Sequence, residues 1–113
     1  MPIEVLYTTE FELWWDSLTV EEQKSVGTIV ELLEEFGVAL SFPHSSGIEG
    51  SKKLRELRIQ HRGEPYRVLY AFDPARNAIL LLGGNKAGKD RWYEQNIPRA
   101  ERIFAVYLKE TRQ

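Results

Sequence analysis

Cysteine is absent from this sequence of 113 residues, and histidine occurs only twice. The missing thiols exclude disulfide bonds, cysteine nucleophiles and cysteine-ligated metals, and they fit a reducing compartment. Two histidines without a carboxylate at ligand spacing form no convincing metal site. The Gly-x4-Gly-Lys-Ser/Thr motif of a P-loop is missing as well, so nucleotide hydrolysis is not predicted.

Long hydrophobic runs are also missing. The apolar run at residues 78–82 is far too short to cross a bilayer, and residues 1–4 have neither the basic region nor the apolar core of a signal peptide. A hydrophobic content of 42% and an aromatic content of 12% are nevertheless those of a globular protein. We expect one cytoplasmic domain over residues 1–113, with no membrane partner.

Basic residues are almost absent from the first half of the chain. Residues 1–50 hold ten acids and a single base, Lys24, whereas residues 51–113 hold fourteen bases and seven acids. The two halves therefore carry charges of −9 and +7, although the net charge is only −2. A phosphate backbone responds to a local patch and not to the sum, so a polyanion partner for the second half stays possible.

Two helices are predicted in the acidic half. Thr9 with Glu12, and Thr19 with Glu22, stand at the spacing of a capping box, which marks the start of a helix. A glycine at position 37 is placed to end the second helix. The apolar residues between these signals follow the i, i+3, i+4, i+7 spacing of one helix face. They are Val26, Ile29, Val30 and Leu33.

Strands are predicted before and after these helices. Residues 38–53 are rich in Ser, Gly and Pro and are expected to form a long loop. Pro98 is expected at the first position of a last helix. The predicted strands are residues 3–7, 54–60, 66–72 and 78–82. The resulting order, β-α-α-β-β-β-α, is that of a small α+β fold.

Three residue clusters in this order resemble the RelE/ParE superfamily of bacterial toxins, closest to its HigB-like, phage-derived branch. They are Leu-Arg-Glu-Leu-Arg at 54–58, Pro-Tyr-Arg-Val-Leu-Tyr at 65–70, and residues 81–98 with Gly-Gly-Asn-Lys and Arg-Trp-Tyr. The resemblance implies a RelE-like fold, in which a helical hairpin packs on a twisted, mainly antiparallel sheet. It also implies the toxin of a type II toxin–antitoxin system. Such a toxin is a ribosome-dependent mRNA endoribonuclease that uses no metal or cofactor and inhibits translation.

The same resemblance implies partners. They are the ribosome, its mRNA and a cognate antitoxin, which is often a helix-turn-helix protein. The toxin would contact DNA only through its complex with this antitoxin. Two alternatives stay open at this point. ParE-like members of the superfamily inhibit DNA gyrase by binding, without catalysis, and a degenerate relative could act only as a corepressor with its antitoxin.

Cleavage of RNA without a metal needs three aids at one phosphate. The 2′-OH must lose a proton, the phosphorane must be neutralised, and the 5′-oxygen must gain a proton. Arg67, Lys86 and Lys89 are predicted to neutralise the phosphorane, and Arg67 matches the position where relatives carry a phosphate-contacting arginine. Tyr93 is predicted as a proton donor or a stacking surface. With an ordinary pKa of about 10, it would need neighbouring cations to act as a base.

Further basic residues are predicted to bind RNA around this centre. They are Arg55, Arg58, His61, Arg62 and Arg91. Structural roles are the alternatives: an ion pair of Arg67 with Glu56 or Glu64, a pair of Arg58 with Glu56, or an exposed turn for His61. Some relatives have a catalytic histidine near the C-terminus of the domain, and this chain has none there. The general base and acid are therefore left open between lysine and tyrosine.

Overall fold

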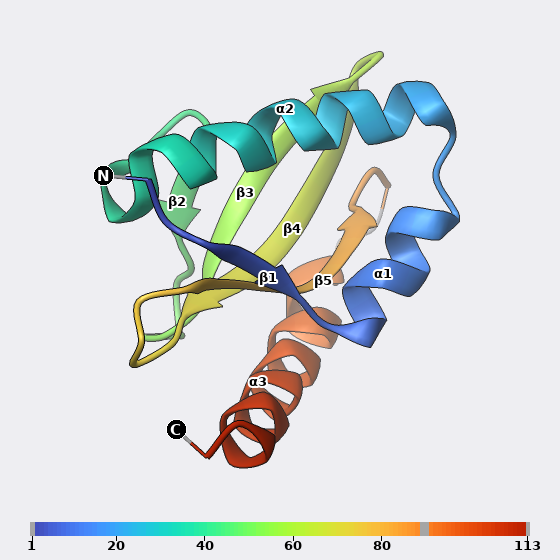
Figure 1. Cartoon of the computed structure of the whole chain (residues 1–113). Coiled ribbons are helices and arrows are strands. Elements are labelled where there is room, and N and C mark those ends of the chain that lie inside the picture. Colours follow the sequence, from blue (N-terminus) through green and yellow to red (C-terminus); the bar gives the residue numbers. More distant parts are fainter. Residues whose placement is uncertain (1, 89–90, 113) are drawn as a thin grey trace.

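The structure is a computed structural model that describes residues 2–88 and 91–112. In these residues the chain forms a five-stranded mixed sheet with helices on both faces (Figure 1). The elements are β1 (Val5–Tyr7), α1 (Thr9–Asp16), α2 (Val20–Phe36), a 3-10 turn η1 (Gly37–Ala39), β2 (Ser45–Gly47), β3 (Arg55–His61), β4 (Glu64–Phe72), β5 (Ala78–Asn85) and α3 (Trp92–Glu110). None of the helices in these ranges is both long and apolar enough to cross a membrane. The predicted α+β class and element order are confirmed, with β2 as an addition.

The strands lie side by side in the order β1-β5-β4-β3-β2. β1 pairs with β5 in parallel, and the other three pairs are antiparallel. β4 and β5, the strands that are apolar on both faces, occupy central positions, as the uninterrupted apolar runs predict. β5 is longer than predicted, because the glycines at 83 and 84 and Asn85 still pair with β4 and do not form a loop.

The strand β2 is absent from the sequence-based prediction, which treats residues 38–53 as one loop. Ser45–Gly47 nevertheless pairs with β3, with Ser45 opposite Leu57. The side chain of Ser45 is buried and shares a 2.7 Å hydrogen bond with the hydroxyl of Tyr70. A Ser-Ser-Gly segment has neither the alternation nor the β-branched residues that mark a strand. Its strand conformation therefore depends on contacts with distant residues.

The two helix starts illustrate local and non-local control. The capping box of α2 is confirmed: the Glu22 N–H donates to Thr19 Oγ1 at 3.1 Å, and the Thr19 N–H donates to Glu22 Oε1 at 2.7 Å. The prediction of Thr9 as the cap of α1 is wrong by one residue. Thr8 takes that place, because its hydroxyl accepts from the first turn of α1 at 3.2 Å and donates to the carbonyl of Leu81 in β5 at 2.7 Å.

The helix ends contain one confirmed prediction and one error. Gly37 ends α2 with a φ of 56°, a conformation that glycine adopts without strain. Pro98 does not open the last helix, since α3 begins at Trp92 and Pro98 lies inside it. The buried residues Trp92, Ala100 and Phe104 share the face of α3 that packs on the sheet, so side-chain burial sets where this helix begins.

Each face of the sheet has its own hydrophobic core. α1 packs along β5 and α2 along β3 on one face, and α3 covers part of the other face (Figure 1). Alternation along β4 divides its side chains between them, with Val68 and Tyr70 under α1 and α2 and Leu69 and Ala71 under α3.

Two consecutive glycines let a tryptophan approach each face of β5. A Cβ atom at Gly83 would clash with the ring of Trp14 from α1, and one at Gly84 would lie 2.8 Å from Nε1 of Trp92. Trp92 is the first residue of α3, so its close approach fixes where that helix starts against the sheet. Tyr93, the next residue, is thereby held over the polar part of the same face.

Candidate active site

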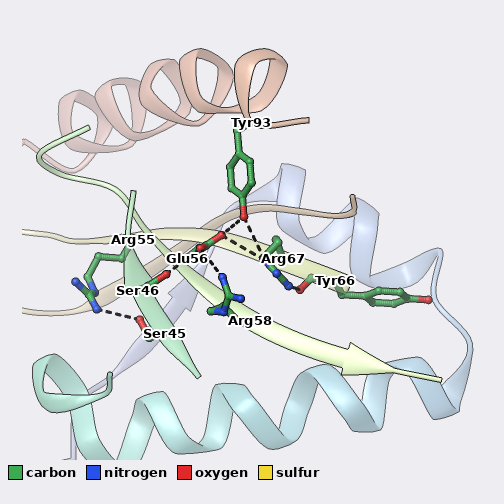
Figure 2. Close-up of polar contacts among 8 residues, drawn as sticks. All are labelled: Ser45, Ser46, Arg55, Glu56, Arg58, Tyr66, Arg67 and Tyr93. Atoms are coloured by element: carbon green, nitrogen blue, oxygen red, sulfur yellow. Dashed lines mark hydrogen bonds and ion pairs between the residues drawn. The ribbon is translucent and has the colours of Figure 1, made fainter. Parts of the chain in front are cut away.

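A polar cluster lies on the face of the sheet that α3 covers, under the first turn of that helix (Figure 2). Alternation along β3 turns Leu57 toward α2 and places Glu56 and Arg58 on the α3 side. Arg67 of β4 is the direct cross-strand neighbour of Arg58. Tyr93 reaches down from α3 to complete the cluster (Figure 2).

Glu56 is the centre of this cluster. Its Oε1 accepts a hydrogen bond from the Tyr93 hydroxyl at 2.5 Å and lies 3.4 Å from Nε of Arg67. Its Oε2 accepts from Ser46 Oγ at 2.8 Å and from Nη1 of Arg58 at 3.2 Å. The residue is only 5% exposed, and this ring of donors offsets the cost of burying a carboxylate.

Arg67 is as deeply buried as its partner, with 3% of its surface exposed. Its Nε also donates to the Tyr93 hydroxyl at 3.2 Å, and its Nη1 donates to the backbone carbonyl of Tyr66 at 3.0 Å. The pairing of Arg67 with Glu56, given above as the structural alternative, is therefore present. The Nε of Arg67 thus faces both the carboxylate of Glu56 and the hydroxyl of Tyr93 in the free protein.

Tyr93 is a neutral phenol in this environment. Burial raises the pKa of Tyr93, and the hydrogen bond to Glu56 raises it further, whereas Arg67 opposes the rise. Nζ of Lys86 lies 5.9 Å from the centre of the Tyr93 ring, within the range of a cation–π contact. Arg67 therefore acts in the direction expected of a neighbouring cation, but burial and Glu56 outweigh it, so Tyr93 keeps its proton.

The segment after β5 carries the remaining predicted cations. The backbone N–H of Lys86 donates to the carbonyl of Pro65 at 3.0 Å, which ties this residue to the start of β4 beside the cluster. Lys89, the other predicted catalytic lysine, lies outside the described residues. Arg91 is exposed and forms an ion pair of 3.4 Å with Glu94, a pair that contributes little when both side chains are solvated.

Two of the predicted RNA-binding residues contact the acidic helix α2. Nδ1 of His61 shares a 2.7 Å hydrogen bond with Ser25, and Nη2 of Arg62 lies 2.9 Å from Glu21. The ring of His61 also lies 6.0 Å from that of Tyr66, on the core side of β4. Their role in binding RNA stays a prediction, and the arrangement does not bring them to Glu56.

Arg55 is also turned away from the cluster. Its Nε donates to the hydroxyl of Tyr70 and its Nη2 to Ser45 Oγ, both at 3.3 Å. Arg55 and His61 are separated from Leu57 by an even number of positions along β3, so they lie on the same face of the strand as Leu57, which faces α2. The predicted grouping of Arg55 with Arg58 rests on charge, whereas the alternation of the strand sorts Arg58 to one face and Arg55 to the other.

Glu56 has a larger part in the cluster than the sequence predicts. The alternation of the strand already places Glu56 on the face of Arg58 and away from Leu57, but it predicts no more than an ion pair with an arginine. Its contact with Tyr93 could not be read from the sequence, because 37 positions separate the two residues.

Comparison with known proteins agrees with this architecture. The model of a family described as "Phage derived protein Gp49-like" matches residues 13–105. The chain belongs to this family. Two relatives of this Gp49-like protein come from Mycobacterium tuberculosis, the putative toxins HigB2, 42% identical over 84% of the chain, and HigB3, 39% identical over 92%. The chain spans 49% of the length of HigB2 and 92% of that of HigB3.

Solved structures support the same fold. A mutant of the Escherichia coli toxin RelE in the free state aligns with a TM-score of 0.63 and 13% identity, over 88% of this chain and 98% of RelE. RelE in an archaeal RelE–RelB complex from Pyrococcus horikoshii aligns with a TM-score of 0.57 and 19% identity, over 78% and 99% of the two chains. The chain is thus a Gp49-like family member that is similar to the putative HigB toxins and has a RelE-like fold.

Proposed function

We propose that this protein is a ribosome-dependent endoribonuclease that cleaves mRNA and so inhibits translation. The observation that carries the proposal is the cluster of Glu56, Arg67 and Tyr93, with Arg58 and Lys86 at its edge. It combines a proton acceptor, Glu56, in direct contact with a proton donor and two guanidinium groups, and a lysine near the ring of the donor, as metal-independent phosphodiester cleavage requires.

Cleavage by this route moves two protons. The 2′-oxygen loses its proton as it attacks the phosphorus, and the 5′-oxygen gains one as its bond to phosphorus breaks, which leaves a 2′,3′-cyclic phosphate. Glu56 is the carboxylate of the cluster that accepts the first proton. Tyr93, whose pKa is raised by burial, retains the proton that it donates to the leaving oxygen.

The phosphorane is stabilised by the cations of the cluster. Arg58 and Arg67 both pair with Glu56 in the free protein, and Lys86 lies over the ring of Tyr93. A guanidinium binds carboxylate and phosphate oxygens with similar geometry, so an incoming phosphate exchanges with Glu56. The exchange releases the carboxylate to act as a base. Lys89 remains a predicted further cation.

The proposed partners follow from the same function. A cognate antitoxin, which we expect to be a helix-turn-helix protein, inhibits the toxin and provides its link to DNA; one structural neighbour was solved as a RelE–RelB complex. The ribosome presents the mRNA, so the place of action is the cytoplasm. The acidic helices α1 and α2 lie on the other face of the sheet and point away from the RNA in this arrangement (Figure 1).

The test is induced expression in a bacterial host with primer extension on an abundant mRNA. We expect growth arrest and new 5′ ends inside translated codons for the wild type, and about 100-fold less cleavage for Arg67→Ala. Arg102→Ala is the matched control, because Arg102 is an exposed arginine of α3 that is not among the predicted RNA-binding residues. Its cleavage should equal that of the wild type.

A second variant separates loss of chemistry from loss of folding. Arg67→Ala leaves Glu56 with fewer partners in a buried site, which can destabilise the protein. Arg67→Lys keeps a positive charge there but loses the forked geometry, so it should fold and still cleave poorly. Arrest without any mRNA cuts would contradict the nuclease proposal and support a gyrase-binding toxin. Absence of arrest would support a corepressor.

A further inference from the structure

An exposed aromatic ring stands beside the candidate active site. Phe42 lies between η1 and β2, and 71% of its surface is exposed. The guanidinium of Arg58 lies over this ring, 5.3 Å from its centre, and the same guanidinium binds Glu56 at 3.2 Å. One arginine therefore connects the ring to the carboxylate at the centre of the cluster.

The segment that carries Phe42 is anchored on both sides. Leu40 before it and Ser45 after it are buried. The N–H groups of His44 and Ser45 both donate to the carbonyl of Ser41, at 3.0 and 3.1 Å, and the N–H of Arg58 donates to the carbonyl of His44 at 2.9 Å. These bonds hold the ring in a defined position relative to β3 and Arg58.

Burial cannot explain this ring. Leu40, two residues earlier, supplies the apolar contact of the segment with the core, whereas Phe42 leaves most of its surface in water. The guanidinium of Arg58 covers one face of the ring, and the high exposure leaves the other face free. A free aromatic face next to cations is the arrangement by which proteins hold single-stranded RNA, with bases stacked on rings and phosphates on cations.

We infer that Phe42 is a stacking surface for an unpaired nucleobase of the mRNA, next to the phosphate that the cluster cleaves. The inference rests on the proposed nuclease function and adds a base-binding subsite to it. Arg58 backs the ring on one side and directs its charge toward the phosphate backbone on the other. An antitoxin could also cover an exposed phenylalanine, but the cation against the ring favours a polyanion.

Stacking is tested with the purified full chain and short RNA probes that cannot be cleaved. Each probe is 2′-O-methylated and carries one 2-aminopurine, a base whose fluorescence falls when it stacks. We expect quenching by the wild type at one position of the probe, retained in Phe42→Trp. Phe42→Leu should lose the quenching and weaken binding by about 5- to 100-fold, the range for one base–aromatic stack.

A matched substitution controls for the loss of an apolar side chain. Phe36, at the end of α2, is also exposed, so Phe36→Leu should bind and quench like the wild type. Phe42→Leu removes no cation, so the dependence of its Kd on salt should keep the wild-type slope. Equal unfolding temperatures of the variants would exclude a structural cause.

Two outcomes overturn the inference. In the first, Phe42→Leu binds and quenches the probes like the wild type; a loss of antitoxin binding in the same variant would then assign Phe42 to the antitoxin. In the second, the wild type quenches none of the probes. Cleavage on programmed ribosomes, measured in parallel, separates this inference from the proposed function. A wild type that quenches but does not cut refutes the nuclease and keeps the subsite. If Phe42→Leu cuts mRNA and quenches the probes as well as the wild type does, only the subsite is refuted and the nuclease stands.

Discussion

Two tyrosine–glutamate hydrogen bonds, one on each face of the sheet, have the same chemistry and different surroundings. On the α2 side, the hydroxyl of Tyr66 donates to Glu22, which also caps α2. On the α3 side, Tyr93 donates to Glu56. Only the second pair has an arginine at its hydroxyl and carboxylate among the described contacts, since Arg67 lies within 3.4 Å of Glu56 and donates to the Tyr93 hydroxyl at 3.2 Å.

The pKa values express this difference. The hydrogen bond to Glu22 is the main reason that the pKa of Tyr66 rises from 10.0 to about 12, and the same bond lowers the pKa of Glu22. For Tyr93 the main cause is burial, and Arg67 works against the increase. The first pair fixes a helix to the sheet, whereas the second joins a phenol to a carboxylate that arginines also contact, the arrangement on which the proposed cleavage rests.

The largest expected effect comes from removing one hydroxyl from each pair. Tyr93→Phe should reduce mRNA cleavage by about 100-fold or more, since a general acid contributes 10²–10⁴-fold. Tyr66→Phe should leave cleavage within about threefold of the wild type, because its hydroxyl lies on the other face. Cleavage rates on programmed ribosomes, with circular dichroism to verify folding, measure both. Equal losses in the two variants would contradict the functional distinction.

Removal of the negative charges sharpens the same comparison. Glu56→Gln should lower cleavage by about 100-fold, because an amide cannot accept the 2′-OH proton. Binding of uncleavable RNA should instead become tighter, since Arg58 and Arg67 no longer pair with a carboxylate.

Glu22→Gln is the matched variant on the other face and should change neither cleavage nor RNA affinity.

The loss of the buried charge in Glu56→Gln should also reduce the free energy of unfolding, by about 3 kcal/mol. Denaturant unfolding measures this change. Weaker RNA binding by Glu56→Gln would show that Glu56 does not compete with phosphate for the arginines.

The two glycines of β5 offer a test through packing. Gly83→Ala pushes against Trp14 on the α1 side, and Gly84→Ala pushes against Trp92 on the α3 side. Each should lower the free energy of unfolding by about 1–3 kcal/mol, the usual cost of overpacking. Only Gly84→Ala should also reduce cleavage in the folded protein, roughly 10-fold or more, because a shift of Trp92 displaces Tyr93. Melting temperatures and cleavage rates distinguish the two.

The smallest effect concerns stability at alkaline pH. Because the folded pKa of Tyr66 is raised, its hydrogen bond stabilises the fold fully below pH 10 and loses this contribution as the pH rises to about 12. Tyr66→Phe should cost about 1–2 kcal/mol at pH 7, and the difference from the wild type should shrink between pH 10 and 12. Denaturant unfolding at several pH values measures this difference. A difference that stays constant would contradict the raised pKa.

Much of the fold was predictable because it is encoded locally. The capping box of Thr19 and Glu22 and the glycine after Phe36 delimit α2 by contacts within a few residues. The apolar runs of β4 and β5 predict central strands because such strands are buried on both faces. Alternation along β3 places Arg58 away from the core, which is the part of the candidate site that local pattern can specify.

The tertiary structure alone decided what depends on distant partners. β2 forms because Ser45 pairs with β3, Thr8 replaces Thr9 as a cap because it also binds β5, and α3 begins at Trp92 because Gly84 admits its ring. The same holds for the meeting of Glu56 with Tyr93.

The sequence by itself determined the elements other than β2, their order, the family resemblance and the sign of charge in each half. Strand pairing and helix docking decided which charges of different elements meet, whether Tyr93 is neutral, and which distant partners Arg55 and His61 contact. The physical reason is one of range. Periodicity and capping act between near neighbours, whereas burial and charge pairing join residues that only the closed fold brings within a few ångströms.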